Sequence, residues 1–400
     1  MKQNPFSLAF GKEPKTIISN SSIFDEIKDK FLSLNPSSTT TLITGVRGSG
    51  KTVLLTRLCK YFDEIDDWVV VELNPETDML EYLASSIYEK CKYKYKFVKK
   101  DFSFSFKGIS ITLSGENPIS NVITLLEKMF DVLMKKNKKV LICVDDVSNN
   151  QNVKTFVQQY QIFIRKDYPL FLLMTGLYEN VRNLQNEKSL TFLYRAPQIN
   201  IGSLSLMSIA ESFEDVFEVS KEDAIILSKL TNGYAFAYQV LGYVLFEQNK
   251  KKLDGNVLKE FDRYLREYVY EKIYFDLPDK EKMIVNALSK IDDGSISNIM
   301  ENLKMNKENI SQYRDKLLKK GILVKNGWGK LSFALPRFKE YILLQQEFEW
   351  LQVLNYVCCF GASAAKIHYE IGANVFTYYF YLIYNFVWTT YVNHNRFVTF

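Results

Sequence analysis

The strongest constraint on the fold of this chain is a glycine-rich run near its N-terminus, Gly45-Val46-Arg47-Gly48-Ser49-Gly50-Lys51-Thr52. It matches G-x-x-x-x-G-K-[ST] in full, a pattern in which glycines let backbone N–H groups point inward around phosphate oxygens. A β-prone run (residues 40–44) precedes it, and a segment with helical apolar spacing (residues 51–62) follows it. The pattern therefore predicts a strand, a phosphate-binding turn and a helix whose N-terminal end faces ATP. Lys51 would reach the β- and γ-phosphates, and the Thr52 hydroxyl would ligate Mg²⁺.

Two later segments would supply the rest of a hydrolysis site. The apolar run at residues 141–144 ends in Asp145 and Asp146, at the edge of a parallel sheet where ligands bind. Asp145 is expected on the Mg²⁺ side. Asp146 is expected to orient the attacking water as a general base, with a helix N-cap or a solvated turn as the structural alternative. Thr175 ends another apolar run and would lie between the pair of carboxylates and the γ-phosphate, where a small polar side chain can sense that phosphate. Arg195 is either a charge that stabilises the transition state or reads the nucleotide, or a surface ion-pair partner.

The remaining pattern divides the chain into four parts. Apolar runs alternate with helical segments up to residue 204, which indicates an α/β fold with a parallel sheet. We expect a P-loop ATPase core (1–204) with an insert at about 92–114. A helical lid (205–274), a winged helix (275–345) and an aromatic-rich tail (346–400) would follow. The composition, 47% hydrophobic and 24% charged, is that of a globular protein.

The insert alternates apolar with polar residues, and Gly108 can turn the chain, so an amphipathic hairpin is expected. Its interleaved lysines and aromatics, as in Lys92-Tyr93-Lys94-Tyr95, would also suit single-stranded nucleic acid. The same pattern is more common in an edge hairpin with one solvated face, which is the preferred interpretation.

The segment predicted as a winged helix contains three amphipathic helical stretches. Two short β-prone runs (322–325 and 330–333) follow, joined by Asn326-Gly327, which completes a helix-turn-helix plan with a wing. Between Lys304 and Lys330, eight Lys or Arg residues stand against two acids. That basic excess favours contacts with the phosphates of duplex DNA. The alternatives are that the module binds a protein partner or packs on the ATPase.

Several motifs together resemble the bacterial and archaeal AAA+/STAND ATPases, relatives of origin-recognition-type initiators and of the archaeal ATPase family. Besides the phosphate motif and Asp145-Asp146, the residues that carry the resemblance are Asn4-Pro5-Phe6 with Phe10-Gly11, Leu173-Met174-Thr175-Gly176, Thr231-Asn232-Gly233-Tyr234, Gln239 and Leu241-Gly242. The resemblance spans roughly residues 4–345. It implies an ATP-binding core, a helical lid and a C-terminal winged helix.

Three departures from the family pattern affect the expected activity. Ser19-Asn20 stands where many relatives carry Gly-Arg, so an adenine-side contact of the family type is in doubt. Asp146 stands where many AAA+ enzymes have glutamate, and the shorter side chain indicates slow hydrolysis. Ala235 replaces a proline common in the lid, and no arginine stands there to act as a lid sensor. The resemblance therefore implies an ATPase that binds ATP tightly and turns over rarely.

Composition limits the other possibilities. The only histidines, His368 and His394, lie near the C-terminus, which excludes histidine-based catalysis in the main body. The five cysteines show no metal-ligand spacing beyond one adjacent pair, and no apolar run opens the chain, so a cytoplasmic location is expected. Residues 371–395 carry no charge and are long enough to span a bilayer. They are rich in Tyr, Asn and Thr, so a membrane anchor is not the preferred interpretation; a packed terminus and an aberrant tail are the alternatives.

Two functional hypotheses follow from these patterns. In the first, the protein is a slow Mg²⁺-dependent ATPase whose nucleotide state controls engagement of duplex DNA by the winged helix. In the second, it is a signalling or defence-type STAND switch whose winged helix contacts a protein partner rather than DNA and holds the ATPase closed. Self-association of the chain is a further possibility for its partners.

Overall fold

The computed structural model describes residues 3–9, 14–18, 21–91, 104–106, 109–111 and 121–349. They fall into two compact units. The first extends to Val269 and also includes Lys319–Ile322, and the second comprises Tyr270–Leu318 and the chain from Leu323 onward. Phe10-Gly11, Ser19-Asn20 and the tail from residue 350 lie outside the described residues.

The centre of the first unit is a five-stranded sheet in the order β2-β5-β6-β1-β7, and all of its pairings are parallel. Its strands are β1 (Thr40–Thr44), β2 (Trp68–Leu73), β5 (Lys139–Val144), β6 (Leu170–Gly176) and β7 (Gln198–Asn200). The inner strands are almost entirely buried, as expected of strands covered on both faces. This order confirms the predicted α/β class, and it places β6 between β1 and β5.

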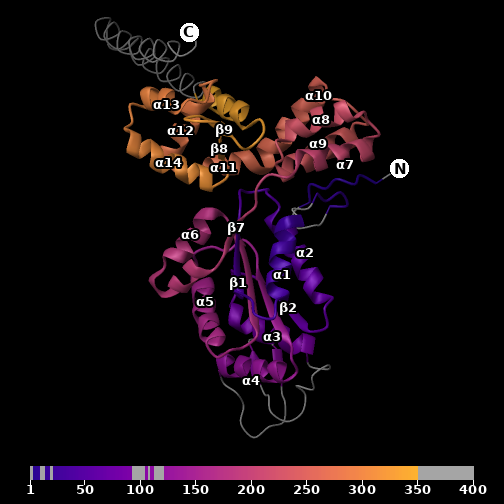
Figure 1. Ribbon diagram of the computed structural model, residues 1–400, viewed down its shortest axis with the longest axis vertical. Helices are drawn as coiled ribbons and strands as arrows, with labels where there is room; N and C mark the ends of the chain where they lie inside the picture. The colour runs from indigo at the N-terminus through magenta and orange to yellow at the C-terminus, as the bar shows by residue number, and fades with distance from the viewer. Residues whose placement is uncertain are drawn as a thin grey trace, which may run out of the picture. The chain divides into compact units, whose positions relative to one another are not determined.

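Helices cover both faces of this sheet (Figure 1). One face packs on α1 (Ser21–Leu32) and α2 (Lys51–Asp63). The other face packs on α3 (Met79–Cys91), α4 (Val122–Lys135), α5 (Gln151–Ile164), α6 (Tyr178–Asn186) and the 3₁₀ segment η1 (Lys188–Arg195). Alternate strand residues divide between the two cores: Val70 joins the α1–α2 side, and Val69 and Val71 join the other.

The predicted insert hairpin is present in its described part. Strands β3 (Phe104–Phe106) and β4 (Ile109–Ile111) pair antiparallel. The flanking residues, including Lys92-Tyr93-Lys94-Tyr95 and Gly108, lie outside the described residues, and the nucleic-acid hypothesis for this insert therefore stays a prediction.

A helical lid completes the first unit. It consists of α7 (Leu206–Phe217), α8 (Lys221–Thr231), α9 (Ala235–Glu247) and α10 (Gly255–Leu265). The N-terminal segment is built into it, because the buried Phe6 ring contacts the rings of Phe213, Phe217 and Tyr238, with centroids 5.5–6.0 Å apart. A Cβ atom on Gly242 would lie 2.3 Å from that ring, so only glycine admits Phe6 at this position.

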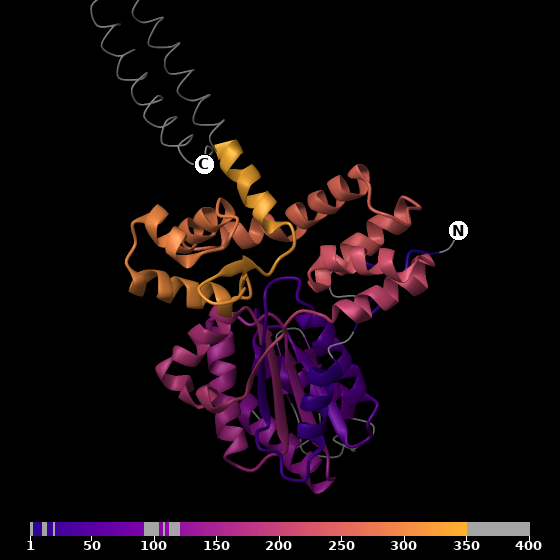
Figure 2. The same cartoon turned by 45° about the horizontal axis from the view of Figure 1, so that its top comes forward.

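The lid continues directly into the second unit. After α10 come a π-helical segment, η2 (Arg266–Tyr270), and a short helix, α11 (Glu271–Phe275). The second unit then has the helices α12 (Asp279–Ser289), α13 (Ile296–Leu303) and α14 (Lys307–Lys319), and the antiparallel hairpin β8 (Leu323–Lys325) and β9 (Leu331–Phe333) (Figure 2). An isolated antiparallel bridge also pairs Ser295, before α13, with Lys330 beside the hairpin. Three helices followed by this wing form a winged helix.

Across the residues that the structure describes, no helix has the length and apolar character that crossing a membrane requires. Cys59, Cys91 and Cys143 are buried free thiols in this part of the chain. The uncharged stretch at residues 371–395 lies outside it, so neither the anchor nor its alternatives are tested.

Candidate functional site at the carboxyl edge of the sheet

The strand order explains why three predicted residues meet. Thr52 follows the turn after β1, Asp145 follows β5, and Thr175 lies on β6 between them. The Thr52 hydroxyl donates to Oδ2 of Asp145 over 2.7 Å, and the Thr175 hydroxyl donates to Oδ1 of the same carboxylate. The half-buried carboxylate of Asp145 therefore joins the glycine-rich turn at residues 45–52, called the phosphate turn from here on, to strand β6.

Asp146 occupies a constrained turn. Its backbone is left-handed (φ 51°), a conformation that few residues other than glycine adopt and that costs conformational energy. Its N–H donates to the Thr175 hydroxyl over 3.1 Å, and the next N–H, that of Val147, donates to the Thr175 carbonyl over 2.8 Å. Thr175 thus lies between the side chain of Asp145 and the backbone of Asp146. The side chain of Asp146 is exposed, so water can reach it.

The phosphate turn has the backbone that its glycines permit. Gly48 (φ 76°) and Gly50 (φ 93°) are left-handed, and a Cβ atom on Gly45 would lie 2.5 Å from Oγ of Ser49. Within the described residues, that Ser49 hydroxyl is buried without a hydrogen-bond partner. Since a buried hydroxyl without a partner carries a desolvation cost, the site suits a ligand rich in acceptor oxygens.

Lys51 is buried at the start of α2, behind the turn. Its Nζ donates to the carbonyls of Gly45 and Val46, each over 3.0 Å. Burial lowers the pKa of Lys51 to about 8, and the charges of Asp146 and then Asp145 partly oppose that shift. The buried ammonium group at this turn is suited to holding a phosphate chain, and the nearby carboxylates favour its protonated form.

The lid also contacts this turn. The Tyr234 hydroxyl donates to the Arg47 carbonyl over 2.5 Å, and the Phe236 N–H donates to the Gly48 carbonyl over 3.1 Å. These contacts bring the lid into the site, which the sequence patterns did not predict.

An apolar pocket lies beside the phosphate turn. Its walls come from the N-terminal segment, from α2 and from the lid, and they include Ile17, Ile18, Val53, Leu204 and Ala235. Arg57 and Gln239 add polar edges. A flat heterocycle attached to a phosphate chain would fit such surroundings. No motif marked this pocket; the apolar Ile17-Ile18 pair ahead of α1 was the one available signal.

Arg195 differs from the other predicted site residues. It is exposed at the end of η1, and within the described part of the chain no hydrogen bond or ion pair joins it to the phosphate turn. Its two interpretations, transition-state charge or surface residue, both stay open.

Comparison with known proteins supports the fold. A family model described as a domain of unknown function, DUF8462, matches residues 267–342. No curated protein sequence matches the chain. The Walker-type ATPase of Pyrococcus abyssi is 14% identical, with a TM-score of 0.58 over 82% of this chain and 96% of that chain. The ORC2 protein of Aeropyrum pernix, determined in ADPNP–ADP complexes, is 12% identical, with a TM-score of 0.53 over 85% of this chain and 97% of that chain. At these identities the likeness shows the fold alone, and the chain has the AAA+-like P-loop ATPase fold.

Proposed function

We propose that the protein is a slow ATPase whose nucleotide state controls engagement of duplex DNA by its winged helix. The observation that carries the proposal is a continuous set of contacts. It leads from the phosphate turn, through the lid, to the helix that enters the second unit.

The described residues suit ATP and Mg²⁺. The glycine turn and the Ser49 hydroxyl would hold phosphate oxygens, and the apolar pocket would hold the base. Within the described residues, no three His, Cys, Asp or Glu side chains gather as a metal site of their own. Thr52 and Asp145 would therefore hold Mg²⁺ together with phosphate and water oxygens, as is usual for this ion. Bound Mg²⁺ would neutralise charge on the β- and γ-phosphates.

The remaining residues would divide the work of hydrolysis. Lys51 would bind the phosphates through a charge-assisted contact, which is stronger than one between neutral groups. The exposed carboxylate of Asp146 would accept a proton from the attacking water. Thr175, which bonds both to the Asp145 carboxylate and to the Asp146 backbone, would adjust that turn when a phosphate arrives.

The route toward the winged helix begins at Gly48. Its carbonyl accepts the N–H of Phe236, and the Phe236 ring packs on the ring of Tyr268, with centroids 6.1 Å apart. Tyr268 lies in the π-helical segment η2, and such segments frequently mark functional sites in helices. A displacement of the Gly48 carbonyl would therefore be transmitted to η2.

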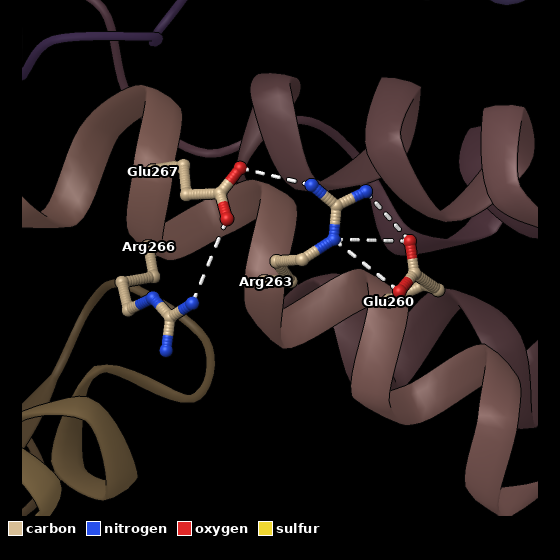
Figure 3. Close-up of polar contacts among 4 residues, drawn as sticks. All are labelled: Glu260, Arg263, Arg266 and Glu267. Atoms are coloured by element: carbon tan, nitrogen blue, oxygen red, sulfur yellow. Dashed lines mark hydrogen bonds and ion pairs between the residues drawn. The ribbon is translucent and has the colours of Figure 1, made fainter.

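An ion-pair network stiffens the helix just before that segment. Figure 3 shows Arg263 between Glu260 and Glu267, with nitrogen–oxygen distances of 2.6 and 2.9 Å. Arg266 also approaches Glu267, at 3.6 Å. These groups are partly exposed, so each pair contributes little stability on its own, at most about 1 kcal/mol. What they contribute here is a restraint on geometry, because the pair of Glu267 with Arg263 connects the first turn of η2 to α10.

The last residue of η2 belongs to the second unit. Tyr270 is buried there, its hydroxyl donates to the Pro336 carbonyl, and its ring packs on Phe338 with centroids 5.0 Å apart. Two tyrosines in one five-residue segment thus anchor it in different units, Tyr268 in the first and Tyr270 in the second. This arrangement supports η2 as the coupling element.

The winged helix offers a polar, basic face on α14. Asn309, Gln312, Lys316 and Lys319 are exposed at a spacing that groups them on one side of the helix. Asn and Gln can read adenine edges, and lysines can contact phosphates. The wing adds Trp328, fully exposed between two left-handed glycines.

Duplex binding measured against salt concentration, with ATP, with ADP and without nucleotide, tests the proposal. We expect affinity that depends on the nucleotide. We also expect Lys316→Ala/Lys319→Ala to flatten the slope of log K against log salt by about 1.8, or about 0.9 for each phosphate that the variant no longer neutralises. Lys221→Ala/Lys229→Ala, which removes two exposed lysines from α8, is the matched control and should leave the slope unchanged. If the parent protein shows no measurable binding to duplex DNA at low salt, with and without ATP, the result would favour the protein-binding switch instead.

A further inference from the structure

We propose that Tyr234 of the lid is a positioning residue for ATP, because its hydroxyl holds the phosphate turn in its binding conformation. The proposal rests on the proposed ATP-binding function and identifies a part of the site that no phosphate-motif residue supplies.

Four successive carbonyls of the turn, at residues 45–48, each accept a hydrogen bond. Lys51 supplies the donor for the first two, the Tyr234 hydroxyl for the third and the Phe236 N–H for the fourth. Tyr234 lies 187 residues from Arg47 along the chain. The Ser49 N–H also donates to the Val46 carbonyl, over 3.2 Å, so two of these five hydrogen bonds come from the lid and three from the motif itself.

Peptide planarity links the Tyr234 hydrogen bond to the neighbouring N–H of Gly48. In a planar trans peptide, the carbonyl of one residue and the N–H of the next point in opposite directions. Holding the Arg47 carbonyl toward Tyr234 therefore aims the Gly48 N–H away from the lid. Within the described residues, that N–H has no hydrogen-bond partner. Inward-pointing N–H groups of this kind form the anion-binding concavity of a phosphate turn.

The lid also fits closely against Gly48. A Cβ atom on Gly48 would lie 2.3 Å from the Tyr234 hydroxyl oxygen and 3.0 Å from Cβ of Phe236. The motif G-x-x-x-x-G-K-[ST] does not require glycine at position 48. Glycine is needed there because the lid lies so close and because the backbone φ is positive. Burial raises the pKa of Tyr234, which keeps its hydroxyl protonated as a donor.

The local sequence explains how Tyr234 reaches the turn. Helix α8 ends at Thr231, and two left-handed residues, Asn232 (φ 48°) and Gly233 (φ 72°), follow it before α9 begins. A Cβ atom on Gly233 would lie 2.7 Å from the Leu204 carbonyl oxygen, so the chain turns there in close contact with the segment that leads into the lid. The turn places Tyr234 immediately before α9, where it is buried with 5% of its surface exposed.

Tyr234→Phe is the direct test, because it removes the hydroxyl and keeps the ring. Loss of one buried hydrogen bond should weaken ATP and ADP binding about fivefold in calorimetric titration. KM should rise by a similar factor while kcat changes little, because Asp146 and Thr175 are untouched. Without nucleotide, the amides of residues 45–52 should exchange hydrogen faster than in the parent protein.

Tyr160→Phe is the matched control. Tyr160 is fully buried, and its hydroxyl contacts the Leu170 and Thr39 carbonyls and the hydroxyls of Thr39 and Thr40. These residues lie at the ends of β6 and β1 that are far from Thr175 and from the phosphate turn. The variant's nucleotide affinity and the exchange of residues 45–52 should match those of the parent. Equal weakening in both variants, or parental affinity in Tyr234→Phe, would overturn the inference. A parent protein with no measurable ATP affinity would instead overturn the proposed function, and this inference with it.

Discussion

Raising the pH should weaken ATP binding through one side chain, Lys51. Its ammonium group is buried behind the phosphate turn, and burial lowers its pKa to about 8 from an ordinary 10.5. Only the protonated form carries the charge that would bind the β- and γ-phosphates. The nucleotide's own negative charge would raise the pKa of Lys51 in the complex, so the bound state retains the proton when the free protein has lost it.

The size of the effect follows from that pKa. At pH 7 about nine tenths of the free protein has Lys51 protonated, and at pH 9 about one tenth does. The apparent Kd for ATP should therefore be nearly constant below pH 7 and rise about tenfold between pH 7 and pH 9. Over the same range, binding should change from almost proton-neutral to an uptake of nearly one proton.

Calorimetric titration in pairs of buffers with different ionisation enthalpies measures both quantities together. Lys51→Ala is the control: its ATP affinity should be much weaker at every pH, and its remaining pH dependence reports all other groups. Subtracting that profile isolates Lys51. A parent Kd that stays constant to pH 9.5, or that rises in parallel with that of Lys51→Ala, would refute the assignment of this pH dependence to Lys51.

Two further predictions concern chemistry and coupling. Asp146→Asn should keep ATP affinity but slow single-turnover phosphate release at least about 100-fold, because an amide cannot accept the proton; an unchanged rate would move the base elsewhere. Tyr268→Ala should leave ATP affinity within about twofold yet remove the nucleotide dependence of DNA binding. Tyr82→Ala, at a similarly half-exposed tyrosine on α3, should retain that dependence, and a Tyr268→Ala protein that also retains it would argue against coupling through η2.

The features that sequence predicted best are those fixed by short-range patterns. The strand, glycine turn and helix around Lys51 follow from a complete motif and from apolar spacing on both sides of it. The meeting of Asp145 with Thr52 was predictable too, because the carboxyl ends of parallel strands share one edge of a sheet. Local periodicity likewise predicted the helices and hairpin of the second unit.

The features that sequence missed depend on contacts between distant segments. Nothing local to β6 specifies that it lies between β1 and β5. Thr175 was expected near the carboxylates, but its hydrogen bonds to the Asp145 side chain and the Asp146 backbone were not predicted. The apolar pocket draws its walls from Ile17 and Ile18 at one end of the unit and from Ala235 at the other. The residues that line such a pocket do not recur at a regular spacing in the sequence, so no periodic pattern reveals them. Gly48 was a usable signal, because a glycine where a motif does not require one indicates a positive φ or a close neighbour.

The π-helical segment shows most clearly why patterns in the sequence stop short of mechanism. Residues 255–275 have the composition of one continuous helix, and no proline or glycine interrupts the part from 256 onward. The structure instead has a π-helical segment within this stretch. Tyr268 of that segment packs against Phe236 in the lid, while Tyr270 is buried in the second unit. A π segment closes i→i+5 hydrogen bonds in place of the i→i+4 bonds of an α-helix and is wound more loosely, so conversion of η2 to α-helix would turn the following residues around the helix axis. For a switch that works through this helix, the two tyrosine contacts would set the balance between the two forms, and the contact of Phe236 with Gly48 would let ATP shift it.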